Sequence, residues 1–194
     1  MKKIRTSIQK NKKFIEFLIF FLLLGVLLGV FFYYKVDHTE VLDEIKNISK
    51  YINQKSISFL GNHFFILMTL IACSCFGFGL ILFPLVFIYE GITISYYILS
   101  FLTVYQLKGF IYSILSLIIL KGIYLLILSI LFKTIFQLLK QVLNYLKNEN
   151  QNIKNIFIIY GKRIFLLSFI LIINDIFIKL WGSNILNILI EIIN

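Results

Sequence analysis

One stretch of the sequence limits the possible folds more than any other. From Phe64 to Leu107 the chain carries a single charged residue, Glu90. A helix that crosses the hydrocarbon core of a bilayer needs about 20 mostly apolar residues. This stretch has about twice that length, so it is predicted to turn back on itself inside a membrane.

The composition agrees with a membrane location. Hydrophobic residues make up 60% of the 194 residues and charged residues only 14%, whereas a soluble domain has about 25% charged residues. The polar surface is too small to cover a water-soluble globule, which excludes a soluble enzyme, a nucleic-acid module and a secreted disulfide scaffold. The net charge of +10 is therefore assigned to cytoplasmic membrane edges and anionic headgroups, and no nucleic-acid partner is expected.

Three other stretches are also long and apolar enough to cross a bilayer. Dividing the long run in two gives five predicted spans, and we predict an all-α polytopic membrane helix bundle that forms a single domain over residues 1–194. An outer loop and an inner amphipathic segment connect the spans. The predicted spans are 14–34, 64–82, 84–105, 110–132 and 164–181, with the outer loop at 35–63 and the inner segment at 133–163.

The turn inside the long run has two candidate positions. A turn at Gly79 to Pro84 uses glycine at a helix end and proline at the start of the next helix, where its missing N–H costs little. A turn at residues 89–91 would leave less even spans. The first position is preferred, and it places Glu90 inside the membrane.

The positive-inside rule fixes the predicted orientation, because cytoplasmic loops carry an excess of lysine and arginine. The N-terminal segment and the inner segment together are rich in these residues, and the other side has fewer, partly offset by acidic residues. A multi-pass protein of the bacterial cell membrane is predicted, with a cytoplasmic N-terminus and an extracytoplasmic C-terminus. The basic residues of the predicted inner side are Lys2, Lys3, Arg5, Lys10, Lys12, Lys13, Lys133, Lys140, Lys147, Lys154, Lys162 and Arg163.

The inner segment has a helical repeat. Lys133, Lys140 and Lys147 recur every seven residues, and apolar residues recur between them at spacings of three and four. This pattern is typical of an amphipathic helix. It predicts a helix lying along the inner membrane surface with its lysines among the headgroups.

Ionisable residues inside the predicted spans are the main candidates for function. A charge near the bilayer centre costs about 2.5 to 3.5 kcal/mol unless it is paired or hydrated. Lys121 and Asp175 both lie at about 16 Å depth and could meet. The group is interpreted as a structural ion-pair cluster, with an ion or proton pathway and contact with a partner's helix as alternatives. Its members are Glu90, Lys121, Asn174, Asp175 and Lys179.

Two glycines in the first span allow a close approach of another helix. Gly25 and Gly29 form a G-x-x-x-G motif, which packs against a helix of the same chain or of another. No catalytic motif is present, and no cofactor is expected. His38 and His63 are interpreted as residues of the membrane edge, and the cysteines Cys73 and Cys75 as packing residues, so no metal site is expected.

The order and spacing of these features resemble the stage II sporulation protein M family of bacterial integral membrane proteins. The resemblance rests on a glycine-to-proline turn, here Gly79 to Pro84, a charged residue before glycine, here Glu90, and a Lys-Gly-Phe entry to the fourth span, here residues 108–110. The family usually has a basic residue at the position of Glu90. Its fourth span usually carries a proline and an amide, where this chain has residues 119–121, ending in Lys121. These departures have opposite signs, so a Glu90–Lys121 pair is predicted.

The resemblance implies a function in engulfment during endospore formation. Members of the family resemble multi-span scaffolds that hold single-span peptidoglycan-degrading proteins, the stage II D and P proteins, at the forespore septum. A small transporter or permease component that uses Glu90, Lys121 and Asp175 is the alternative. No catalytic residue is expected under either interpretation of the sequence.

Overall fold

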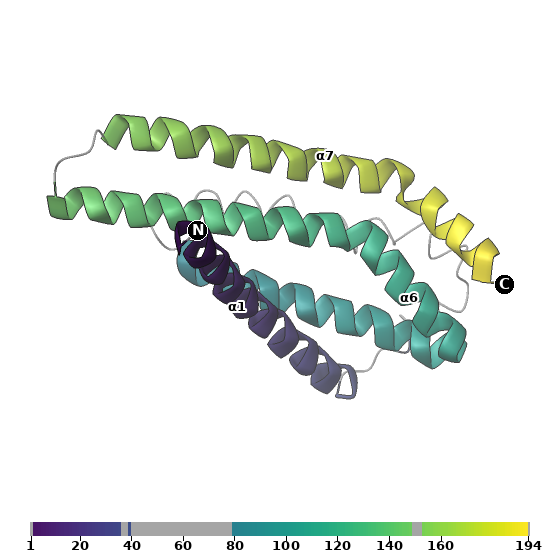
Figure 1. Ribbon diagram of the computed structural model, residues 1–194. Coiled ribbons are helices and arrows are strands. Elements are labelled where there is room, and N and C mark those ends of the chain that lie inside the picture. The colour runs from purple at the N-terminus through teal and green to yellow at the C-terminus, as the bar shows by residue number, and fades with distance from the viewer. Residues whose placement is uncertain (1, 36–38, 40–78, 149–152, 194) are drawn as a thin grey trace.

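The computed structural model describes residues 2–35, 39, 79–148 and 153–193, and long helices make up nearly all of this part of the chain. The helices are α1 (Lys2–Tyr33), α6 (Gly79–Asn148) and α7 (Ile153–Ile193), arranged as Figure 1 shows. All three are long and apolar enough to cross a membrane. The predicted outer loop, apart from its first residue and residue 39, and most of the predicted second span lie outside the described residues.

Helix α6 folds back on itself at Gln106. Residues 79–105 form its first arm and residues 107–148 its second arm, and the two run antiparallel (Figure 1). Tyr97 and Ser116 form a hydrogen bond of 3.0 Å across the arms, and Phe83 stacks on Phe132 with 4.5 Å between the ring centroids. The turn confirms the predicted separation of residues 84–105 from residues 110–132.

The backbone at this turn favours glycine at two positions. Gln106 has φ 53° and ψ −135°, in a region that side chains other than glycine seldom adopt. Three residues later, a Cβ atom on Gly109 would come within 2.8 Å of the Phe101 carbonyl carbon. The tight return of the second arm therefore depends on the absence of a side chain at Gly109, while Gln106 stores backbone strain.

Replacing Gln106 with glycine is expected to raise the free energy of unfolding by about 1 kcal/mol, since relief of strain outweighs the added freedom of the unfolded chain. Gln106→Val is the matched variant and is expected to lower it, because a β-branched side chain tolerates positive φ poorly. Thermal unfolding of the purified protein in detergent, followed by circular dichroism, measures both. A lower midpoint for Gln106→Gly would contradict the strained turn.

The predicted turn at Gly79 to Pro84 is wrong, and so is its alternative at residues 89–91. Helix α6 runs without interruption from Gly79 to residue 105, with Pro84 inside it. Pro84 is only the sixth residue of the helix, so its missing N–H removes a single bond, to the carbonyl of Leu80, and its fixed φ suits a helix. The predicted boundary between residues 64–82 and 84–105 is therefore wrong, and residues 64–78 lie outside the described part.

No separate amphipathic helix begins at Lys133. Helix α6 continues through this residue to Asn148, and Figure 1 shows the end of the second arm running straight on beside the beginning of α7. Ile135 belongs to the buried core, and Leu138 and Ile156 are also buried. Part of the apolar repeat is thus used in helix packing, whereas Phe136, Leu143 and Leu146 are exposed. The second arm is about 63 Å long, roughly twice the thickness of a bilayer core.

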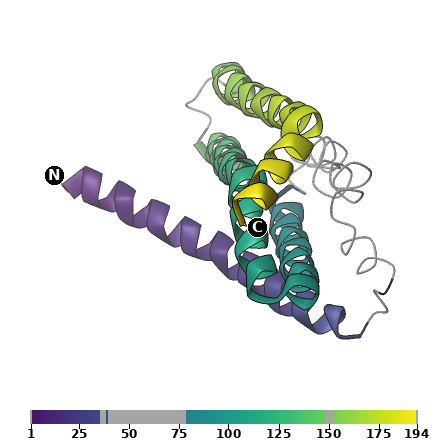
Figure 2. The same cartoon turned by 90° about the vertical axis from the view of Figure 1, so that its right-hand side faces the viewer.

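Helix α7 is longer than the predicted span 164–181 at both ends. It begins at Ile153 and continues to Ile193, and Figures 1 and 2 show it bending toward its C-terminal end. The segment that follows Trp181 therefore continues the helix.

Helix α1 runs parallel to the first arm of α6. Gly25 lies against Ile88, Gly29 lies against Ile92, and the Tyr33 hydroxyl is 3.0 Å from the Thr103 hydroxyl, so residue numbers rise together along both helices. Figure 2 shows α1 crossing beside the paired arms. The end of α1 and the beginning of α6 consequently lie at opposite ends of the bundle.

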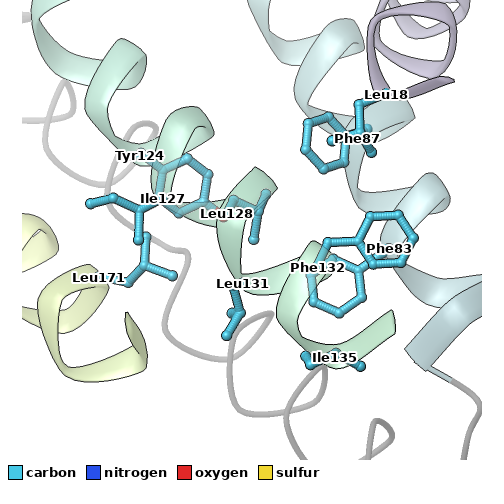
Figure 3. Packing of buried hydrophobic residues seen from close by; sticks show 10 residues of the cluster. All are labelled: Leu18, Phe83, Phe87, Tyr124, Ile127, Leu128, Leu131, Phe132, Ile135 and Leu171. Atoms are coloured by element: carbon cyan, nitrogen blue, oxygen red, sulfur yellow. The ribbon is translucent and has the colours of Figure 1, made fainter. Parts of the chain in front are cut away.

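The main buried core joins all four helical segments. Phe83 and Phe87 from the first arm face the second arm, α1 adds Leu18, and α7 adds Leu171 (Figure 3). Burial of large side chains from each segment fixes the bundle around the second arm. The ten buried members are Leu18, Phe83, Phe87, Tyr124, Ile127, Leu128, Leu131, Phe132, Ile135 and Leu171.

Candidate functional site

A buried ion pair connects the two arms of α6. The Lys121 Nζ donates a hydrogen bond of 2.7 Å to the Glu90 Oε2, and the two side chains are 3% and 0% exposed. The antiparallel arms bring these residues together although 31 positions separate them in sequence. The structure confirms the pair that the opposite departures from the family pattern predicted.

Thr93 completes the polar contacts around the ammonium group. The Lys121 Nζ also donates to the Thr93 Oγ1 at 2.7 Å, and the Thr93 hydroxyl donates to the Glu90 carbonyl oxygen at 2.9 Å. One hydroxyl thus accepts from the lysine and donates to the backbone. The sequence analysis missed Thr93, although its position three residues after Glu90 places both on one helix face.

Helix α1 covers the face of the first arm next to Glu90. A Cβ atom on Gly25 would come within 2.8 Å of the Ile88 Cα, and one on Gly91 would come within 2.8 Å of the Val26 nitrogen. The two backbones are therefore in direct contact. Small residues permit such contact. Within a lipid bilayer no hydrophobic effect drives helices together, so close packing of this kind is what holds them in contact.

The glycines of α1 face a matching motif on α6. Gly91 and Ser95 are four residues apart, as are Gly25 and Gly29, and the position of a Cβ on Gly29 would overlap Ser95. We call these four residues the small-residue seam. The structure places the predicted G-x-x-x-G motif against the same chain. The four-residue spacing of Gly91 and Ser95 is the sequence signal that could have identified the partner of this motif on α6.

The remaining predicted polar residues lie on α7. Asn174 is half-buried, and its Nδ2 has no hydrogen-bond partner among the described residues. The side chains of Asp175 and Lys179 lie outside what the structure describes, so the predicted meeting of Lys121 with Asp175 stays a prediction. The Lys121 ammonium donates hydrogen bonds to Glu90 and Thr93.

Two further hydrogen bonds join helices at greater distance from the ion pair. The Tyr97 and Ser116 hydroxyls connect the arms, and the Tyr33 and Thr103 hydroxyls connect α1 to the first arm. Within the described ranges no group of three His, Cys, Asp or Glu side chains could hold a metal ion. The two histidines and two cysteines considered from the sequence lie outside those ranges.

Comparison with known proteins gives no match to a family model, a curated protein or a solved structure. The fold and the site define a class: an all-helical protein whose three long apolar helices are suited to a membrane and whose arms are joined by a buried Glu–Lys pair.

Proposed function

We propose that this protein is an integral membrane scaffold with five spans. The parallel directions of α1 and the first arm support this number. If both helices cross the bilayer in the same direction, the chain between Tyr33 and Gly79 must cross it once in the opposite direction. We assign that return to the part of the predicted second span that precedes Gly79, residues 64–78, which lies outside the described residues.

The charge distribution supports a cytoplasmic N-terminus for the scaffold. Lys12 and Lys13 precede Phe14, whose ring lies 5.4 Å from that of Phe132, next to Lys133. These lysines mark the end at which α1 and the first arm begin, since Phe83 of that arm stacks on Phe132. Lys35 and Lys108 mark the other end, where Tyr33 meets Thr103. The first end carries the larger excess of basic residues, and the positive-inside rule places it in the cytoplasm.

The observation that carries the scaffold proposal is that the buried Glu90–Lys121 ion pair joins the two arms of α6. Lys121 donates to Glu90 and to Thr93, and all three side chains belong to the arms of α6. A fixed ion pair of this kind orients helices. The outward faces of α1 and α7 carry large apolar side chains at membrane depth, which suit lipid or the single helix of a client protein. They include Phe17, Phe20, Leu27, Phe165, Phe169 and Phe177.

The resemblance to the stage II sporulation protein M family narrows the proposal. We place the scaffold in the engulfment machinery of the forespore septum, where it positions single-span peptidoglycan hydrolases of the stage II D and P type. Its mechanism is to raise their local concentration in the membrane plane, without bond chemistry of its own.

A pull-down of the whole chain from sporulating cells in a mild detergent tests this function. Recovery of a wall hydrolase is the expected result. Recovery of an ATPase or a substrate-binding subunit instead would overturn the scaffold in favour of a permease component.

The second candidate is a small transporter, and the amide nitrogen of Asn174, which has no hydrogen-bond partner among the described residues, favours it. Polar groups inside a bundle mark ion and proton pathways in many membrane proteins. Under this candidate, Glu90 and Lys121 would carry the charge and Asn174 would line the path.

Replacing Glu90 with leucine and Lys121 with methionine together separates the two candidates. A buried ion pair can often be exchanged for apolar residues with little loss of stability, so a scaffold is expected to recover hydrolases as before. Proton flux into liposomes containing the protein, read with a pH-sensitive dye, is the second measurement. A flux present in the unaltered protein and abolished in the double variant would support transport and contradict the scaffold.

A further inference from the structure

An apolar groove lies between α1 and the second arm of α6. It consists of two adjoining hollows of about 210 Å³ and about 330 Å³ that share Ile15, Leu126 and Ser129. Phe87 of the first arm contributes to the smaller hollow, and Lys133 lines the larger one. The larger hollow has the size at which ligand pockets begin, about 300 Å³.

The groove has the length of one membrane leaflet. On α1 it extends from Phe14 to Leu22, and on α6 from Leu125 to Lys133. Each of these distances is about 12 Å along the helix axis, close to half of the bilayer core of about 30 Å. A transmembrane helix of another protein would need a surface of full membrane depth, whereas an acyl chain needs only one leaflet.

The mouth of the groove is basic. Lys133 lines it directly, and the exposed residues Lys12 and Lys13 precede Phe14 on the facing helix. The nearby acid Glu16 is 3.8 Å from Lys12 and compensates one of these charges. A net positive charge at the end of an apolar groove complements a phosphate group joined to a hydrocarbon chain.

We infer that this groove is a binding site for an anionic phospholipid, with one acyl chain between α1 and the second arm and the phosphate at Lys133. Ser129, about one helical turn from Lys133, donates its hydroxyl to the Leu125 carbonyl oxygen at 2.7 Å. An acyl chain in the groove therefore meets no free hydrogen-bond donor at Ser129. The site requires only that the helices lie in a membrane, and it is independent of the scaffold function.

Native mass spectrometry of the full chain tests the site, with dioleoyl phosphatidylglycerol as the probe and dioleoyl phosphatidylcholine as its zwitterionic counterpart. Tighter binding of phosphatidylglycerol is expected. Lys133→Gln is expected to weaken it about fivefold, the effect of one lysine near an anionic surface. Lys140→Gln, an exposed lysine one heptad further on the same arm, removes the same charge outside the groove and is expected to leave binding unchanged.

A second pair of variants tests the acyl-chain part of the groove. Ser129→Phe fills the lining shared by both hollows and is expected to abolish the preference for phosphatidylglycerol while Lys133 is retained. Ile119→Phe adds the same ring at an exposed position of the same helix and is expected to have no effect. Equal binding of the two lipids, or equal effects of the two lysine variants, would overturn the proposal even if the hydrolase pull-down succeeds. A Ser129→Phe protein that retains the full preference would also overturn it.

Discussion

Replacing Lys121 with methionine is expected to lower the free energy of unfolding by about 3 to 5 kcal/mol, the cost of breaking a buried ion pair from one side. The substitution leaves the Glu90 carboxylate without its lysine in a site where that side chain is fully buried. It also removes the donor that contacts Thr93. Unfolding of the purified protein in mixed micelles, followed by circular dichroism as the share of denaturing detergent rises, measures the loss.

Two variants identify the cause of this loss as the missing partner. Adding Glu90→Leu to Lys121→Met is expected to restore most of the stability, because the buried carboxylate that has lost its lysine is then removed as well. The double reversal, Glu90→Lys with Lys121→Glu, is expected to rescue either single reversal. Lys140→Met, at an exposed position, is the control and should change little. Failure of both double variants to recover stability would show that the pair does not hold the arms together.

Alanine at Gly25 is expected to lower the free energy of unfolding by about 1 to 3 kcal/mol, the usual cost of forcing atoms into a packed interface. The added methyl group would overlap the backbone of Ile88, which cannot move aside as a side chain can. Helix α1 must then separate from the first arm, which also disturbs the hydrogen bond between Tyr33 and Thr103. The same unfolding experiment gives the change.

The matched control for this variant is Gly122→Ala. A Cβ atom on Gly122 meets nothing within 4 Å, and alanine inside a helix is more favourable than glycine by about 0.5 to 1 kcal/mol. The two substitutions have the same chemistry and opposite expected signs. A stabilising effect of Gly25→Ala would mean that the small-residue seam is not closely packed.

Those features of the fold that depend on local chemistry could be predicted from the sequence. Span length and hydropathy predicted α1 and both arms of α6, and the gap between the predicted spans 84–105 and 110–132 contains the turn at Gln106. The Glu90–Lys121 contact was predicted from the opposite signs of the two departures from the family pattern, whereas residue depth alone pointed to Lys121 and Asp175.

The features that the sequence missed depend on what each helix packs against. Pro84 has the same fixed φ whether it begins a helix or lies in its second turn, so it could not locate the turn. The apolar repeat after Lys133 has the same period whether it contacts lipid or α7. Thr93 and Gly91 acquire their functions only when Lys121 and α1 approach them.

The distance between Glu90 and Lys121 along the chain has a consequence for biosynthesis. At about 5 to 20 residues per second, the ribosome needs about two to six seconds to make the 31 residues from the acid to its counter-charge. A lone carboxylate that partitions into hydrocarbon early would be costly throughout this delay. In the proposed membrane scaffold, the hairpin of α6 is therefore expected to enter the bilayer as one unit, which makes the timing of translation part of how the fold forms.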